Sequence, residues 1–182
     1  MRTLKQPELE ALAQGAALLG GGGGGSLAAA QMFIPVIAKA GGITLTDAPP
    51  AGDGCVLADI GANSSIEAGQ VKAIDNCMAL PTAQRGGKAF TCLYAVETGP
   101  ENTLAPMVYA AQHGLPVFDG DGAGRAVPEI PLCSYATSGI NVNPLAIAND
   151  GPDAVVAFAK DSADMDALLR PITAANQFGV SA

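Results

Sequence analysis

Large aromatic side chains are scarce in this sequence, so they cannot fill its core. Aromatic residues make up 4% of the 182 residues and tryptophan is absent, whereas hydrophobic residues of all kinds make up 49%. The core must therefore be built from alanine, valine, leucine and isoleucine. The chain is long enough to bury such a core within one domain. Its 23 glycines and 13 prolines suit an α/β domain with many tight loops.

Positive charge is also in short supply. Nine basic residues stand against seventeen acidic ones, which gives a net charge of -8. This excess argues against nucleic acid or an anionic membrane surface as a partner. The sequence has no run of 18 apolar residues that would span a membrane, and Glu8 and Glu10 interrupt the apolar stretch that a signal peptide would need. We therefore expect a cytoplasmic protein with no nucleic-acid or membrane partner.

Residues that bind zinc are few and poorly spaced. The sequence has one histidine, His113, and no Cys-x-x-Cys pair, so no zinc site is expected. Without a secretion signal, reduced thiols are the better interpretation, because buried free cysteines behave as small hydrophobic residues. His113 suits the C-terminal end of a helix, where a cation is favourable. The four cysteines are Cys55, Cys77, Cys92 and Cys133.

Helical and strand patterns alternate along the chain. This alternation predicts one α/β domain over residues 1–182, with a mostly parallel or mixed sheet flanked by helices. The short crossover between the strands that end at Val96 and Phe118 predicts that these two strands are parallel neighbours. Pro81 begins a predicted surface loop over residues 81–88. Helices are predicted at 7–19, 28–40, from about 66, from Asn102 to about 113 and at 162–169, and strands at 43–47, 55–60, 90–96, 115–118, 131–137, 145–148 and 154–159.

Six consecutive glycines occupy positions 20–25. Such a run is typical of a flexible linker. It is equally suited to a loop that cradles a ligand, because Ser26 can cap the next helix and present its free amides to an anion. The candidate ligand-binding residues here are Gly22, Gly23, Gly24, Gly25 and Ser26.

A polar cluster follows the predicted strand at 115–118. Four charged residues stand within eleven positions of a chain that is only 14% charged, and the glycines between them allow close approach of the backbone to a ligand. Open α/β sheets usually place their sites just past the C-terminal ends of strands. We therefore expect one pocket, closed on one side by the glycine run and lined by Glu97, Asn102, Asp119, Asp121 and Arg125.

Each member of this cluster also has an ordinary structural interpretation. Asp119 and Asp121 are two residues apart and would share one face of an extended segment. There they could share a proton or bind a divalent cation, or they could simply stabilise a turn. Arg125 could neutralise them or hold a substrate carboxylate. Gly122 and Glu129 complete the candidate binding residues, although Glu129 also fits the start of an exposed segment.

Two stretches carry a family resemblance. The segment GLPVFDGDGAGRAVPE, preceded by ETGPENTLAP, resembles the signature of the DUF917 family, also described as the S-methyl thiohydantoin desulfurase family. The resemblance covers the N-terminal domain, and residues 171–182 match the beginning of a second domain in longer members. It also implies a second glycine-rich loop at residues 61–65, with Glu67 as the acidic residue after it. The family usually continues its first glycine run with an acidic or amide residue and proline, where Ser26 and Leu27 stand here.

The resemblance implies an enzyme of hydrolase or desulfurase type that acts on a small cyclic amide or imide, such as a hydantoin or thiohydantoin. Glu97, Asp119, Asp121 and Arg125 are the candidate catalytic residues. Asp119 or Asp121 would be the general base, while Asn102 and Arg125 would orient or polarise the ring carbonyl. The alternative is a non-catalytic subunit that binds a small molecule and completes its site with a partner chain.

Both hypotheses expect a small-molecule ligand. Both also expect either a homo-oligomer or a partner chain that supplies the second domain. The cofactor is left open, with a divalent metal as one candidate.

Overall fold

An eight-stranded mixed sheet runs through the computed structural model of the chain, which describes residues 1–60, 69–176 and 180–182. The strand order is β1-β2-β5-β4-β3-β8-β6-β7. The strands are β1 (Arg2–Leu4), β2 (Ile43–Thr46), β3 (Gly54–Asp59), β4 (Cys92–Ala95), β5 (Val117–Asp121), β6 (Leu145–Ala148), β7 (Ala154–Ala157) and β8 (Val180–Ser181).

The centre of this sheet is parallel. Strands β2, β5, β4 and β3 pair in parallel, whereas β1, β8, β6 and β7 pair antiparallel with their neighbours. Leu93 of β4 lies opposite Val117 of β5, which confirms the prediction that these two strands are parallel neighbours. The fold class is therefore as predicted: a single α/β domain with a mixed sheet flanked by helices.

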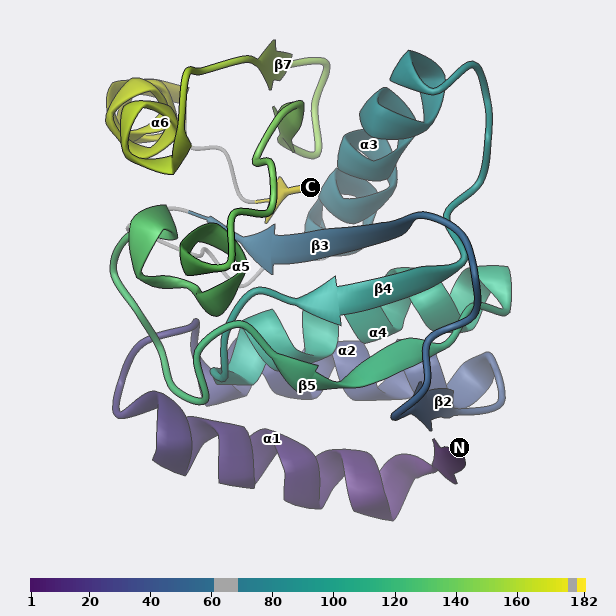
Figure 1. The fold of residues 1–182 in the computed structure, drawn as a ribbon. Coiled ribbons are helices and arrows are strands. Elements are labelled where there is room, and N and C mark those ends of the chain that lie inside the picture. The colour runs from purple at the N-terminus through teal and green to yellow at the C-terminus, as the bar shows by residue number, and fades with distance from the viewer. Residues whose placement is uncertain (61–68, 177–179) are drawn as a thin grey trace.

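The helices pack around the sheet (Figure 1). Helix α4 packs on β3 and β4, α1 and α2 pack on α4, and α3 packs on β6 and β8. Helix α6 contacts the short helix η1 instead, and it lies with α5 on the side toward which β3 and β4 point. Within the described ranges, no helix is both long and apolar enough to cross a membrane. The helices are α1 (Gln6–Gly20), α2 (Leu27–Lys39), α3 (Gly69–Gln84), α4 (Pro100–His113), η1 (Ile130–Leu132), α5 (Ser134–Thr137) and α6 (Ser162–Asn176).

Aliphatic side chains fill the core, as the composition requires. The main cluster joins α1, α2, α3 and α4 to the central strands and includes Leu57, Leu93 and Leu104, none of which is exposed. A second, smaller cluster lies between β6, β7 and α6 around Ile147 and Met165. The four cysteines are buried and not joined in disulfides.

Three predicted elements are wrong. The predicted strand at 131–137 is η1 followed by α5, because Tyr135 donates to the carbonyl of Ala95 and the amide of Ser134 donates to the carbonyl of Gly122. These contacts turn the segment across the ends of β4 and β5. The predicted loop at 81–88 begins inside α3, because the helix continues through Pro81 as far as Gln84.

The start of the helix predicted to begin at Asn102 is the third. The helix begins at Pro100 with Gly99 as its N-cap, which suits the preference of proline for the first helical turn.

The C-terminal region also differs from expectation. Helix α6 continues past Leu169 to Asn176, and β8 lies between β3 and β6. Of the residues that match the beginning of a second domain in longer family members, Val180 and Ser181 therefore pair within this sheet. The glycine-rich loop predicted at 61–65 and Glu67 lie outside the described residues.

Candidate functional site

Glu97 is a buried carboxyl group just beyond the C-terminal end of β4. Its side chain is held by two donors: Asn102 Nδ2 lies 2.7 Å from Oε1 and the amide nitrogen of Val127 lies 2.5 Å from Oε2. Burial raises the pKa of Glu97 above its ordinary value; these two hydrogen bonds lower it in part, and the nearby Asp121 raises it again. Glu97 is therefore a fixed acid that can exchange a proton closer to neutral pH than an exposed glutamate.

Asn102 fixes the position of Glu97. It comes from the first turn of α4, and its Oδ1 accepts a hydrogen bond of 2.7 Å from the backbone amide of Asp59 at the end of β3. Its Nδ2 is thereby turned toward Glu97. The ends of two parallel strands are joined through this one amide side chain, which is 5% exposed. The structure thus brings together two of the predicted site residues, Glu97 and Asn102.

The two aspartates of β5 have separate partners. Asp121 accepts from Thr98 Oγ1 at 2.7 Å and from the amides of Ala123 and Gly124. Asp119 is more exposed and pairs with Arg2 at 3.2 Å. Asp121 therefore holds the turn after β5, and it is Asp121 rather than Asp119 that acts electrostatically on Glu97.

An irregularity in the sheet explains this separation. Leu93 lies opposite Val117, but Ala95 lies opposite Asp121. Between these two pairs β5 therefore advances by four residues while β4 advances by two. Such a bulge breaks the strict alternation of side chains along a strand. The spacing of Asp119 and Asp121 consequently does not give them a common partner.

Arg125 lies on the exposed part of the loop after β5. Its Nε donates to the carbonyl of Ala126 at 3.3 Å, and it forms no ion pair with a carboxylate in the part of the chain that the structure describes. Gly122 is placed more tightly, because its amide donates to the carbonyl of Val96 at 3.1 Å. A side chain at Gly122 would collide with that carbonyl and with the ring of Tyr135.

The glycine run packs against the first turn of α4. The carbonyl of Gly24 accepts from the amides of Glu101 and Asn102 at 3.0 and 3.2 Å, and a Cβ on Gly24 would lie 2.5 Å from the Cα of Gly99. Ser26 caps α2 through the amide of Ala29, as predicted, and its own amide donates to the buried Glu101. The run is held by these contacts, so the flexible-linker interpretation is wrong. A role in ligand binding stays a prediction.

A cavity of about 770 Å³ opens beside Glu97 and Asn102. This volume falls within the range of small-molecule sites, about 300 to 1,000 Å³. Glu129 joins its lining, whereas Asp119, Asp121, Arg125 and the candidate residues at 22–26 do not. The cavity therefore contains only part of the predicted pocket. Its walls are mainly aliphatic, contributed by Val56, Ala58 and Ile60 at β3 and by Val142, Leu145 and Leu169 across from them.

Two lining residues, Cys133 and Tyr135, carry no signal in the sequence. The Cys133 thiol is buried 3.8 Å from the carbonyl of Val96; burial, together with Glu97 and Asp121, raises its pKa to about 11. The pKa of Tyr135 is also raised, mainly by burial and then by the nearby Asp121. Its hydroxyl donates to the carbonyl of Ala95 at 2.9 Å. Both groups are protonated near neutral pH and can act only as weak donors or packing surfaces.

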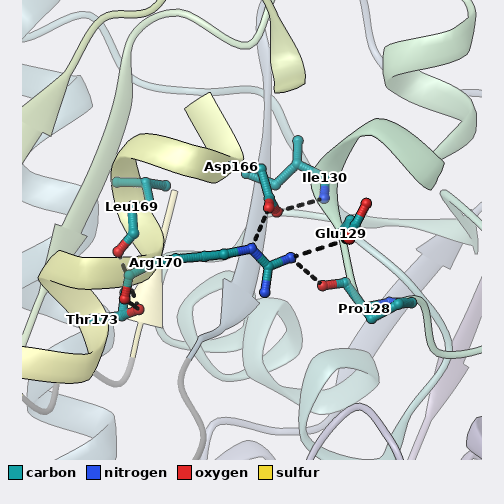
Figure 2. Close-up of polar contacts among 7 residues, drawn as sticks. All are labelled: Pro128, Glu129, Ile130, Asp166, Leu169, Arg170 and Thr173. Atoms are coloured by element: carbon teal, nitrogen blue, oxygen red, sulfur yellow. Dashed lines mark hydrogen bonds and ion pairs between the residues drawn. The ribbon is translucent and has the colours of Figure 1, made fainter. Parts of the chain in front are cut away.

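An arginine on α6 ties that helix to the loop before η1 (Figure 2). Arg170 Nε lies 2.6 Å from Asp166, and one Nη lies 3.1 Å from the carbonyl of Pro128 and 3.7 Å from Glu129. Asp166 also accepts from the amide of Ile130 at 3.1 Å. These contacts bring Glu129 into the cavity wall. The spacing of Asp166 and Arg170, four residues apart in a helical pattern, is the sequence signal for this pair.

Metal ligands do not gather in this region. Across residues 1–60, 69–176 and 180–182, no group of three or more histidine, cysteine, aspartate or glutamate side chains is placed to hold a metal ion.

Comparisons with known proteins identify relatives of this fold. A family model described as "S-Me-THD-like, N-terminal domain" matches residues 7–159. A crystal structure of a protein from Chromobacterium violaceum is 30% identical, with a TM-score of 0.83. The comparison covers 100% of this chain and 54% of the Chromobacterium chain, so this chain spans about half of that relative's length. No match was found among curated proteins.

Proposed function

This chain belongs to the family of S-Me-THD-like N-terminal domains, and on that premise we propose that it forms the substrate-binding part of an enzyme. The substrate class is a small cyclic amide or imide of hydantoin or thiohydantoin type. The observation that carries this proposal is Glu97, a buried carboxyl group with a raised pKa on the lining of a cavity of small-molecule size. A proton-exchanging group in such a place is what a hydrolytic reaction requires.

Glu97 takes the role of general base in this proposal. It removes a proton from a water molecule that attacks the ring carbon bearing the sulfur substituent, and the carbon–oxygen bond forms. The carbon–sulfur bond then breaks, and the proton held by Glu97 passes to the departing thiolate. Each oxygen of Glu97 accepts one hydrogen bond from the protein, which leaves lone pairs free for this exchange.

The other candidate residues have supporting roles. Asn102 positions Glu97 and is not itself required to touch the ring. Asp119 and Asp121 are less suited to be the base, because one pairs with Arg2 and the other holds a turn. The glycine run and Glu129 remain candidate ligand contacts, as does Arg125 if the loop that carries it bends toward a bound substrate.

A non-catalytic binding subunit is the second candidate. It requires only the cavity of small-molecule size and no proton transfer by Glu97. A second copy or a partner chain would then complete the site over the cavity, because small-molecule sites commonly form between domains.

Turnover and binding distinguish the two candidates. We would measure thiol release from an S-methyl thiohydantoin and calorimetric binding of the hydantoin product. The proteins compared are the wild type, Glu97→Gln and a matched control, Glu10→Gln, which makes the same change on the exposed face of α1. For an enzyme, the wild type and the control turn over, and Glu97→Gln loses at least about a hundredfold in rate.

Other outcomes would count against an enzyme that uses Glu97 as its base. Binding without turnover in every variant supports the binding subunit. A wild type that shows neither turnover nor hydantoin binding, or equal turnover in the wild type and Glu97→Gln, refutes the proposed function.

A further inference from the structure

The cavity beside Glu97 carries an excess of negative charge. Four carboxylates line it against two guanidinium groups: Asp59, Glu97, Glu129 and Asp166 against Arg85 and Arg170. Even with Glu97 protonated, three carboxylates still face two cations. The whole chain has the same sign of charge, at -8, so the surroundings do not reverse the balance.

Each of the two cations already has an acidic neighbour. Arg170 has two acidic neighbours, Asp166 at 2.6 Å and Glu129 at 3.7 Å (Figure 2). Arg85 lies 2.6 Å from Asp53 and places its guanidinium 4.5 Å from the centre of the Phe90 ring. A ligand carboxylate would have to compete with these partners for either cation, while the other lining carboxylates repelled it.

The remaining wall is apolar. Aliphatic side chains from β3, the 140–145 segment and α6 supply most of the lining. A charged group placed against them would lose its hydration without finding a counterion, which is unfavourable. Glu97, in contrast, offers its carboxyl oxygens as acceptors to the N–H groups of a polar ring.

From this arrangement we infer that the cavity selects a ligand whose ring substituent is uncharged and apolar, and that it discriminates against ligands carrying a carboxylate. The identity of the ring as a hydantoin rests on the proposed function; the charge selection rests on the lining residues alone. The substrate class is thereby narrowed to cyclic amides that bear aliphatic or aromatic substituents.

Two matched pairs of ligands test this inference by calorimetry at pH 7. The first pair shares the proposed ring: 5-isobutylhydantoin and hydantoin-5-propionic acid, which are similar in size and differ in charge. The second pair lacks that ring: 4-phenylbutanol and 4-phenylbutyrate. We expect the neutral member of each pair to bind at least about tenfold more tightly, with a preference that widens as salt is lowered.

Removal of one lining carboxylate tests whether the preference for neutral ligands arises in this cavity. Glu129→Gln replaces one lining carboxylate with an amide. It should reduce the ratio of affinities for the neutral and the charged ligand of each pair about threefold or more. Glu10→Gln, which makes the same change on the exposed face of α1, should leave it unaltered. Equal narrowing in both variants, or none in Glu129→Gln, would overturn the assignment.

The two ligand pairs also separate this inference from the proposed function. If the hydantoins fail to bind and the phenyl pair keeps its preference, the proposed function falls and the charge selection stands. If hydantoin-5-propionic acid binds as tightly as its neutral partner or more tightly, the inference is overturned and the hydantoin proposal survives. Absence of binding by all four compounds overturns both.

Discussion

Truncation of Asn102 to alanine probes the contact on which the candidate site depends. The change deletes two buried hydrogen bonds, the donor to Glu97 Oε1 and the acceptor for the amide of Asp59, each 2.7 Å long. Two buried polar groups are then left without these partners, and each such loss costs about 1–3 kcal/mol. We therefore expect Asn102→Ala to lower the free energy of unfolding by about 2–6 kcal/mol at neutral pH.

The same truncation should make stability depend more strongly on pH. Burial already raises the pKa of Glu97 above its ordinary value of 4.5, and Asn102 partly offsets that rise. A raised pKa in the folded state means that stability is fully present below the unfolded pKa and is lost as pH rises through the folded pKa. Removing Asn102 raises the folded pKa further, so the cost of the truncation should be smaller at pH 4 than at pH 7.5.

Urea denaturation at these two pH values measures both effects. Asn141→Ala, the same truncation at an exposed position, provides the comparison and should cost no more than about 1 kcal/mol. A loss below about 1 kcal/mol for Asn102→Ala at pH 7.5, or an equal loss at both pH values, would refute the reasoning.

Three further predictions concern other parts of the molecule. Gly24→Ala should destabilise the protein by about 1–3 kcal/mol in urea denaturation, because Gly24 has a φ of +71° and its added Cβ would meet Gly99. Gly22→Ala, with positive φ but open space around it, should cost less, and equal losses would contradict the packing argument. Cys133, with its pKa raised to about 11, should react with iodoacetamide at pH 7.5 much more slowly in the folded than in the urea-unfolded protein, as mass spectrometry would show; equal rates would disprove its burial. Arg170→Met should lower the free energy of unfolding by no more than about 1 kcal/mol, because the ion pairs of Arg170 are partly exposed. It should nevertheless speed amide hydrogen exchange in α6, and unchanged exchange there would mean that the contacts of Arg170 with the loop before η1 do not hold the helix.

The central part of the fold was predictable from local patterns. The apolar runs before Glu97 and Asp119 and the helix between them predict parallel neighbours, which the structure confirms. Convergence of Glu97 and Asn102 follows from chain connectivity, because Glu97 lies just after β4 and Asn102 lies in the first turn of the helix that comes next. Fold class and this pair of residues therefore needed only hydrophobic pattern and chain connectivity.

The rest depends on contacts that the sequence does not display. The bulge that separates Asp119 from Asp121 arises from pairing with β4, not from the residues of β5 alone. Pro81 is tolerated within α3 because the tertiary packing of that helix outweighs local propensity. The cavity could not be foreseen for a similar reason: its far wall comes from α6 and the 127–145 segment, whose positions are set by contacts such as those of Arg170 and Tyr135.

The position of β8 has a consequence for the order in which the chain can fold. Strand β8 lies between β3 and β6 (Figure 1), so the β6–β7 hairpin reaches the parallel strands through residues 180–181. During synthesis, β3 is made about 120 residues before the strand that covers its free edge. Because closing so long a loop has an entropic cost, the edge of β3 should stay open until late. Throughout that interval the half-built domain would expose an unpaired strand edge, the kind of surface at which newly made chains aggregate or recruit chaperones.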